Sequence, residues 1–372
     1  MTTDGTRGWR PMDKRRSNTG WLRLLALLAA LGMIAAACGS DDGDDDTAAG
    51  DDDGAAEEAS GDNFGIDLTG KSIRMTSPEA SPLQMGQYLV LDKLSEWGAE
   101  TELITIISTT GIQALVADQA DIAPHGADEL VLGAAEGADA TAIGAPEAQL
   151  NYVVVTSKEN PDVASLADKN FGMSGPAGFD ALIGRFAVRD AGMDPESDVN
   201  FIQIGGSPDR AAALLAGQID AATIFADDWI NLDQQTDDLH VIVRATDIVQ
   251  GIPGSLYMGR SDYWIENDDI AFATACANLE VNKWIQENRD DFIAYAMENV
   301  EGVEQAAVEE VYDFAMEVNM FPTSPDEVLT NAGMNDLMNA MLETGDISSE
   351  VDMGPHVNTG FLEDAVAAGC GQ

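Results

Sequence analysis

The segment between Val163 and Thr223 constrains the fold most strongly, because apolar stretches of strand length alternate in it with stretches of helical periodicity. The strand-like stretches are Asn170 to Met173, Val199 to Ile204 and Ile219 to Ile224. Between them, apolar residues recur with the spacing of one helix face. Strands and helices that alternate in this order predict a βαβαβ unit, in which the strands form a parallel sheet and the helices cross over it.

The turn after the first of these strands is rich in glycine. Residues 174–178 have the sequence Ser-Gly-Pro-Ala-Gly, and a helical pattern begins directly after them. Glycine lets the backbone approach a bound molecule closely, and the free N–H groups at a helix N-terminus favour anions and polar atoms. We therefore predict that Ser174, Gly178 and Phe179 form one wall of a ligand-binding site.

Three blocks of this segment resemble a known protein family. The blocks are SLADKNFGMSGPAGFD (165–180), AGMDPESDVNFIQIGGSP (191–208) and AALLAGQIDAA (212–222). They resemble the solute-binding proteins of ABC importers in the nitrate, sulfonate, taurine and thiamine-precursor group, and a weaker resemblance extends from about Lys71 to Val300. The resemblance implies an α/β protein with a two-lobed type II periplasmic-binding fold, a ligand cleft between the lobes and extra C-terminal helices. It also implies a small-molecule solute as ligand and ABC permease subunits as partners.

A second copy of the helix-to-strand pattern supports a two-lobed organisation. The stretch ALVADQADIAP (114–124) has the same pattern as LLAGQIDAA in the unit described above. We predict that lobe 1 covers residues 63–156, that lobe 2 covers residues 157–248, and that residues 249–372 return to lobe 1. Much of this last segment has helical periodicity, and its helices are expected to pack on lobe 1, as they do in the family.

The N-terminus has the features of a bacterial lipoprotein signal. Six Lys and Arg residues precede an apolar stretch from Leu24 to Ala37. Because this stretch is too short to span a bilayer as a stable helix, residues 1–37 are predicted to be a signal peptide. The sequence Ala-Ala-Ala-Cys-Gly-Ser at its end resembles a lipobox, although Ala35 departs from the usual Leu or Val. Cys38 is therefore the predicted lipid anchor; the alternative is an ordinary secretory peptide with an incidental cysteine.

Residues 38–62 form a strongly acidic segment. From Asp41 to Asp62 it contains eleven acidic residues and no basic ones, and the rest is mostly Gly, Ala, Ser and Thr. Such a composition has too little apolar surface to fold, so a disordered tether is predicted. The tether and Cys38 would hold the folded part at the extracytoplasmic face of the cell membrane, although a merely solubilising tail would have nearly the same composition.

Composition and motifs exclude several other functions. The formal net charge of −48 excludes a nucleic-acid-binding surface and opposes attraction to anionic lipids. The sequence contains no G-x-S-x-G, H-E-x-x-H, C-x-x-C or P-loop motif. We therefore expect no enzyme activity, no cofactor and no metal. Two alternatives stay open, namely an enzyme on the same fold that acts on a small metabolite, and a surface lipoprotein that serves as a scaffold.

Ligands of open α/β sheets bind outside the carboxyl ends of the strands, so polar residues at predicted strand ends are candidate contacts. The further candidates chosen on this basis are Ser77, Thr109, Thr110, His125, Asp227 and Trp229. Thr110, Ser174 and Asp227 can also serve only as helix caps. His125 can be an inert loop residue, and Trp229 can fill the hinge side rather than stack on a ligand.

The predicted contacts leave the nature of the solute open. Nitrate, a sulfonate or taurine would have to bind through helix N-termini and hydroxyls such as those of Thr109 and Ser174. Asp227 and Trp229, with Asp228 between them, would suit a flat ring that carries an amine, such as a thiamine-type pyrimidine. We favour an organic solute over a bare inorganic anion, bound by a monomer.

Two cysteines follow Cys38 in the sequence, Cys276 and Cys370. Compartments beyond the membrane permit disulfides, and an even remainder makes an intramolecular pair the simplest arrangement. The C-terminal tail has no apolar anchor of its own, which a disulfide would supply. We predict a Cys276–Cys370 bond; the alternative is that Cys276 is a small buried core residue and Cys370 is free.

Overall fold

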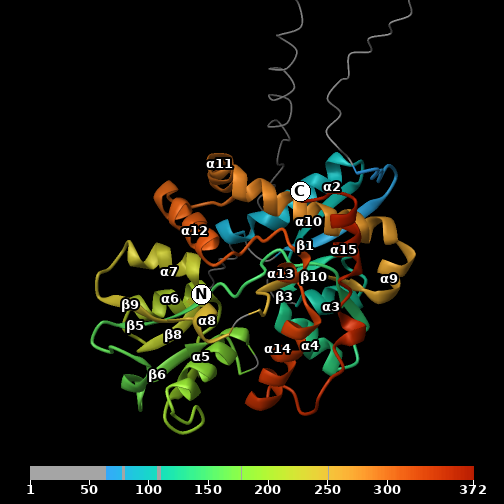
Figure 1. Ribbon diagram of the computed structural model, residues 1–372. Coiled ribbons are helices and arrows are strands. Elements are labelled where there is room, and N and C mark those ends of the chain that lie inside the picture. Colours follow the sequence, from blue (N-terminus) through green and yellow to red (C-terminus); the bar gives the residue numbers. More distant parts are fainter. Residues whose placement is uncertain (1–63, 78–79, 107–109, 177, 250) are drawn as a thin grey trace, which may run out of the picture. The chain divides into compact units, whose positions relative to one another are not determined.

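The computed structural model describes residues 64–77, 80–106, 110–176, 178–249 and 251–372. The predicted signal peptide, the lipid anchor Cys38 and the acidic tether lie outside these ranges, and so does Thr109. The described residues form two lobes, each built around a sheet (Figure 1).

Lobe 1 contains the strands β1, β2, β3, β4 and β10. Their bounds are Ser72–Ser77, Glu100–Thr105, Ala123–Gly126, Ala140–Ala142 and Ser255–Arg260. β1 pairs in parallel with β2, whereas β10 lies between β3 and β4 and is antiparallel to both. A parallel bridge between Met75 and Ile122 joins the two groups, and the Thr76 N–H donates to the Ile122 carbonyl over 3.0 Å. The strand order of lobe 1 is therefore β2-β1-β3-β10-β4.

Lobe 2 contains the strands β5, β6, β7, β8 and β9. Their bounds are Tyr152–Ser157, Asn170–Met173, Asn200–Gln203, Ala221–Phe225 and Leu239–Arg244. The order is β7-β6-β8-β5-β9, with β6 parallel to β7 and β8, and β5 antiparallel to β8 and β9. This order matches that of lobe 1 strand for strand, because β5 occupies the antiparallel position that β10 has there. The predicted βαβαβ unit and the predicted repeat are both present.

Helices connect the strands in each lobe. Lobe 1 has η1 (Pro82–Gln84), α2 (Met85–Glu96), α3 (Gly111–Val116), α4 (Ala127–Ala135) and α9 (Ser261–Glu266). Lobe 2 has η2 (Val163–Leu166), α5 (Phe179–Asp190), α6 (Ser207–Leu215), α7 (Ala226–Asp233) and α8 (Ala245–Ile248). Gly192 and Gly217 follow α5 and α6 with φ of 78° and 64°. Glycine adopts this left-handed conformation without steric cost, which is why the two helices end there.

The predicted lobe boundary at residues 156 and 157 is wrong by one strand. The structure pairs β5 with β8 and β9, so Tyr152–Ser157 belongs to lobe 2, and the crossing from lobe 1 precedes it at residues 143–151. The apolar stretch predicts a buried strand but carries no information on which sheet it joins. The chain returns to lobe 1 between α8 and β10, beside the first crossing, where the Gly254 N–H donates to the Glu147 carbonyl over 2.9 Å.

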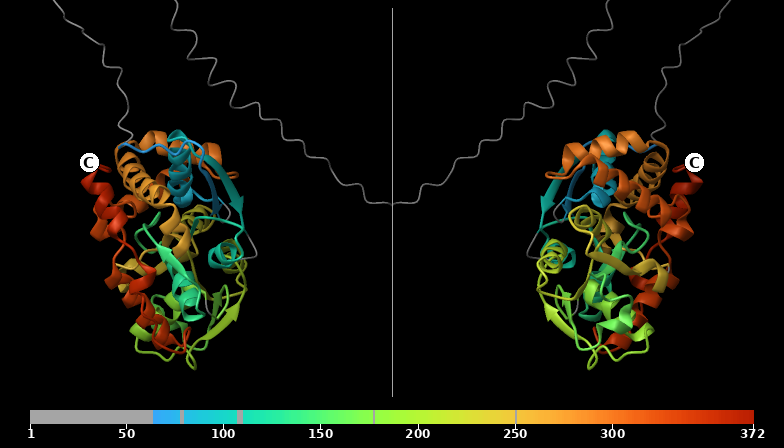
Figure 2. Two further views of the ribbon diagram at one scale, coloured as in Figure 1. Left: turned by 90° about the vertical axis from the view of Figure 1, so that its right-hand side faces the viewer. Right: turned by 90° about the vertical axis from the view of Figure 1, so that its left-hand side faces the viewer.

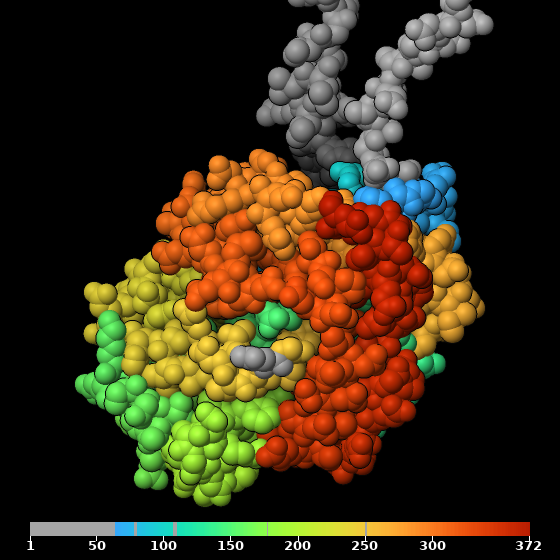
Figure 3. All heavy atoms as spheres, in the orientation of Figure 1, coloured from blue at the N-terminus to red at the C-terminus, as the bar shows by residue number. Residues whose placement is uncertain are grey.

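The C-terminal helices contact both lobes rather than lobe 1 alone. They are α10 (Asp268–Glu287), α11 (Arg289–Asn299), α12 (Gln305–Glu317), α13 (Pro325–Val328), α14 (Asn331–Thr344), η3 (Gly354–His356) and α15 (Gly360–Ala367). α10 packs against α2 of lobe 1, but α12 contacts α7 of lobe 2, and α14 contacts α4 of lobe 1 and α5 of lobe 2. On the face drawn in Figure 3, the orange and red C-terminal segments meet the yellow and green surface of lobe 2.

Three ion pairs join lobe 2 to these C-terminal segments. Arg185 Nη1 lies 3.1 Å from Asp346 Oδ1, and both side chains are largely buried. The exposed pairs are Arg189–Glu343 at 2.9 Å and Arg244–Glu317 at 2.8 Å. Exposed pairs contribute little stability, so the buried pair is the main electrostatic contact across this junction.

A disulfide joins Cys276 of α10 to Cys370, which follows α15, with 5.3 Å between the Cα atoms. The structure thus has the pairing predicted from the sequence, and both residues are fully buried. α15 lies along α10 (Figure 2). The Cys370 N–H also donates to the Ala365 carbonyl over 3.0 Å, so the tail is held by its own helix as well as by the bond.

Candidate ligand-binding cleft

A cavity of about 570 Å³ lies between the lobes, at the carboxyl ends of several strands. Its lobe 1 side is lined by Gln84, Gln87, Thr110, Pro124, His125, Gly126, Asp128, Glu129 and Leu132. Its lobe 2 side is lined by Tyr152, Ser174, Gly178, Phe179, Asp180, Gly206, Ser207, Arg210 and Phe225. The crossing segments and the start of β10 contribute Glu147, Asn151, Gly254 and Ser255.

The structure brings most of the predicted contacts to this cavity. Thr110, His125, Ser174, Gly178 and Phe179 all line it, and they come from both lobes. These five residues follow or end predicted strands, and strand ends of both lobes do meet at this cavity.

Ser77 and Asp227 are predicted contacts that do not line the cavity. Ser77 is fully buried, its hydroxyl lies 3.2 Å from the Tyr88 hydroxyl, and it accepts from Gln87 Nε2 over 3.2 Å. Ser77 therefore positions Gln87, which does line the cavity. Asp227 is buried at the start of α7, where its Oδ1 accepts from the Asp228 N–H over 3.1 Å.

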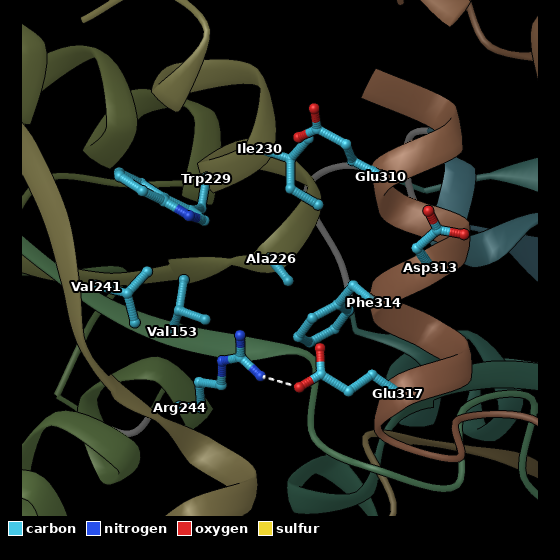
Figure 4. Close-up of a pocket in the computed structure, with 10 residues that line it drawn as sticks. All are labelled: Val153, Ala226, Trp229, Ile230, Val241, Arg244, Glu310, Asp313, Phe314 and Glu317. Atoms are coloured by element: carbon cyan, nitrogen blue, oxygen red, sulfur yellow. Dashed lines mark hydrogen bonds and ion pairs between the residues drawn. The ribbon is translucent and has the colours of Figure 1, made fainter. Parts of the chain in front are cut away.

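Trp229 lines a different pocket of about 400 Å³ between lobe 2 and α12. Figure 4 shows α12 presenting Phe314 toward this pocket, with the Arg244–Glu317 ion pair at one side. The prediction that Trp229 stacks on a ligand in the cleft is therefore wrong. Its side chain belongs to the junction of lobe 2 with α12, which the sequence does not reveal.

Gly178 has a structural role in addition to its place in the cavity wall. A Cβ at this position would lie 2.1 Å from Ser174 Oγ and 2.7 Å from Asp180 Oδ1. The Ser174 hydroxyl donates to that carboxylate, and the Ser174 N–H donates to Asp180 Oδ2 over 2.8 Å. Glycine is thus required to leave room for this internal hydrogen bond, so Gly178→Val would disturb the local fold as well as any ligand contact.

Thr110 is both a cavity residue and a helix cap. Its hydroxyl accepts from the Gln113 N–H over 3.2 Å, which is the capping interaction left open by the sequence. Glu129 of α4 also reaches this helix start, where its Oε2 accepts from the N–H groups of Gly111 at 2.7 Å and Ile112 at 3.4 Å. The other oxygen of Glu129 lies 3.6 Å from His125 Nδ1.

Three aromatic rings form an apolar wall on the lobe 2 side. The ring of Tyr152 lies edge-on to Phe179, with centroids 5.7 Å apart, and 4.8 Å from the ring of Phe225. All three residues line the cavity. Such a wall suits the flat or apolar part of a small organic molecule.

Two buried carboxyl groups in the cavity lack a cationic partner. Asp128 is 8% exposed and Glu147 is 6% exposed, and neither forms an ion pair within the described part of the chain. Burial raises the pKa of both groups to about 8, with the neighbouring Glu129 adding to the shift of Asp128 and Asp227 adding to that of Glu147. The Asn151 amide donates to Glu147 Oε2 over 2.7 Å, which fixes the orientation of that side chain.

Arg210 is the only Lys or Arg among the described lining residues, and it is 2% exposed. Its Nε donates to the Thr223 carbonyl over 2.8 Å, and its Nη1 donates to the Gly205 carbonyl. The same Nη1 lies 3.6 Å from Asp180 Oδ2. Arg210 therefore holds the β8 and α6 turns together and offsets the charge of Asp180.

Several polar atoms along the cavity have no hydrogen-bond partner among the described residues. They are His125 Nε2, Ser255 Oγ and Gln84 Oε1. Unpaired buried polar atoms are costly, so groups of this kind at a cavity are suited to a ligand that supplies the partner.

The residues that the sequence analysis missed are mainly acidic. Asp128 and Glu147 are inconspicuous in a chain with 66 Asp and Glu residues, because acidic side chains usually lie on the surface. One signal was present for Glu147, since it is the only charged residue of the apolar stretch between Ala140 and Val155. Arg210 had no comparable signal, as one basic residue on a predicted amphipathic helix normally faces solvent.

The described ranges contain neither a candidate metal site nor a candidate membrane span. These residues contain no group of three or more His, Cys, Asp or Glu side chains placed to hold a metal ion. None of their helices combines the length and apolar character that a membrane span requires.

Two lobes with the same strand order and a cavity between them define a two-lobed type II periplasmic-binding fold, as the sequence resemblance implied. The chain belongs to the NMT1/THI5 like family, whose model matches residues 100–288. No curated protein sequence matches the chain.

Solved structures support the fold assignment. The periplasmic aliphatic sulphonate-binding protein SsuA from Escherichia coli is 18% identical with a TM-score of 0.62, and the match covers 77% of this chain and 92% of that one. The periplasmic nitrate-binding protein NrtA from Synechocystis PCC 6803 is 11% identical with a TM-score of 0.65, and the match covers 80% and 89%. A Candida albicans protein described as having the generic periplasmic binding protein fold is 13% identical with a TM-score of 0.60, covering 77% and 96%. At these identities, the likeness concerns the fold.

Proposed function

We propose that the protein is the solute-binding component of an ABC importer, which closes around a small organic solute and delivers it to the permease. The observation that carries this proposal is the cavity of about 570 Å³ that both lobes line. Its apolar wall and converging polar groups are the usual composition of a small-molecule site. The family membership and the sulfonate-binding and nitrate-binding structures of the same fold support the same function.

The proposed mechanism is a ligand-driven shift toward the closed form. A solute between His125 of lobe 1 and Phe179 of lobe 2 can contact both only when the lobes are together. Its free energy of binding is therefore larger in the closed form, and this difference drives closure about the crossing segments. The permease would then recognise the closed surface.

Closure on a solute can be measured by small-angle scattering of the mature protein before and after its bound molecule is removed by partial unfolding and dialysis. We expect the radius of gyration to rise when the molecule is removed and to fall when the released fraction is added back. The mass of the molecule should be the same after it has been added back and released a second time as after the first release. A radius that is insensitive to the fraction would favour the scaffold alternative, and a changed mass would favour an enzyme.

We further propose that Cys38 carries a lipid that anchors the protein to the extracytoplasmic face of the membrane. The support is the sequence alone, that is, the small residues before Cys38 and the acidic segment after it. In cells, Cys38→Ser is expected to release the protein from membranes or to block processing, while Ser40→Ala leaves it in the membrane fraction. Fractionation and intact mass measure both results. A correctly cleaved, membrane-bound Cys38→Ser protein would refute the anchor.

A further inference from the structure

The charged side chains that line the cavity restrict the charge of the solute that can bind there. Four carboxyl groups line the cavity, from Asp128, Glu129, Glu147 and Asp180, whereas Arg210 is the only described Lys or Arg there. Arg210 is already committed to two backbone carbonyls and to Asp180. An anionic solute would therefore find only one cationic side chain among the described lining residues, and that side chain is already engaged by the protein.

Backbone amides at two of the turns that line the cavity are already occupied by the protein's own carboxylates. Glu129 accepts from the first two N–H groups of α3, those of Gly111 and Ile112. Asp180 accepts from the N–H and the hydroxyl of Ser174, in the glycine-rich turn before α5. Anions bind at helix starts and turns because such N–H groups are free, and these three N–H groups are not free.

Asp128 and Glu147 remain without a cationic partner. Each lies in the cavity wall and is more than nine-tenths buried. The pKa of each carboxyl group is raised mainly by desolvation, and no neighbouring cation lowers it again. A cation bound in the cavity beside either group would favour its ionised form.

Two observations independent of the carboxyl groups also indicate a ligand. Ser255 is 8% exposed, lines the cavity and has an Oγ with no partner within the described protein. It is next to Glu147, whose carbonyl accepts from the Ser255 N–H over 3.2 Å. The rings of Tyr152, Phe179 and Phe225 face the same cavity, and aromatic faces attract organic cations.

We propose that the solute is an organic cation, with an amidinium, guanidinium or alkylammonium group held by Asp128 and Glu147 and a flat or apolar body against the three rings. This inference rests on the proposed solute-binding function and specifies the chemical class of the solute. It replaces the role that the sequence analysis gave to Asp227 and Trp229, which do not line the cavity.

The test uses three probes of nearly equal shape, benzamidine, benzamide and benzoate, which are cationic, neutral and anionic. Binding to the ligand-depleted mature protein is measured by calorimetry and by the shift in melting temperature. We expect benzamidine to bind at least about tenfold more tightly than benzamide, and benzoate to give no shift. The molecule released from the protein as purified should be identified by mass spectrometry as a compound that is cationic at neutral pH.

Matched variants assign the effect to the two carboxyl groups. Asp128→Asn and Glu147→Gln keep the shape and remove the charge, so each is expected to weaken benzamidine binding about tenfold or more and to leave benzamide binding nearly unchanged. Glu310→Gln removes an exposed charge outside the cavity and should bind benzamidine like the original protein. Circular dichroism checks that every variant is folded.

The outcomes separate this inference from the proposed function. Preference for benzoate, or recovery of nitrate or a sulfonate from the protein, would overturn the cation inference and leave the solute-binding function intact. Equal binding of benzamidine by Glu147→Gln, Asp128→Asn and the original protein would overturn the assignment of the two carboxyl groups. Failure of all three probes to bind, with no small molecule recovered, would overturn both proposals.

Discussion

Reduction of the Cys276–Cys370 disulfide is expected to lower the melting temperature of the ligand-free protein by about 10 °C. The bond closes a loop with a sequence separation of 94, and the chain-entropy relation gives about 4.5 kcal/mol for a loop of that length. For a domain of this size, 1 kcal/mol corresponds to roughly 2 °C. Scanning calorimetry with and without reductant measures the shift.

The double variant Cys276→Ala/Cys370→Ala provides the control for the disulfide. It should melt close to the reduced protein, and reductant should not change its melting temperature further. Both cysteines are fully buried, so the variant tests the covalent bond together with a small change in packing. A shift below about 2 °C on reduction would show that the stability of the C-terminal tail comes from packing rather than from the bond.

The double variant Asp128→Asn/Glu147→Gln is expected to be more stable than the original ligand-free protein at pH 9, by about 5 °C or more. In the folded protein, burial raises the pKa of both carboxyl groups to about 8, whereas unfolded Asp and Glu titrate near pH 4. Between these values the native state binds more protons than the unfolded state, so stability falls as pH rises. Amides do not titrate, so the variant loses this part of the pH dependence.

Melting temperatures between pH 5 and pH 9 test this expectation. The difference between the two proteins should be smallest near pH 5, should grow as pH rises toward about 8, and should level off above that pH. Burial also raises the pKa of Asp227 and that of Asp228, the latter to about 7, so part of the slope persists in the variant. A constant difference across the range, or a less stable variant at pH 9, would contradict the buried, unpaired state of Asp128 and Glu147.

The cavity residues that could be predicted from the sequence are those that follow directly from a local strand or helix pattern. The glycine-rich turn after residue 173 and the polar residue at the end of β3 follow from strand and helix patterns, and both reach the cavity. Thr110 was also identified, and its capping role did not prevent it from lining the same cavity.

The predictions that were wrong or missing concern residues whose positions depend on packing between distant segments of the chain. Trp229 faces a pocket formed with α12, which lies more than 70 residues further along the chain, and no local pattern gives the position of that helix. Asp128 and Glu147 were missed because burial of an acidic side chain is decided by the surrounding fold. The assignment of β5 failed for the same reason, since an apolar strand fits either sheet.

The position of β10 has a consequence for the order in which the two sheets can assemble. β10 lies between β3 and β4, so the sheet of lobe 1 is incomplete until residues 255–260 are available. All strands of lobe 2 precede that point, and they form a contiguous stretch from Tyr152 to Arg244. A chain that emerges N-terminus first can therefore complete the lobe 2 sheet before that of lobe 1. During that interval β3 lacks a partner on one edge and β4 lacks its strand partner altogether, so the incomplete sheet of lobe 1 is the stage most exposed to wrong strand pairing.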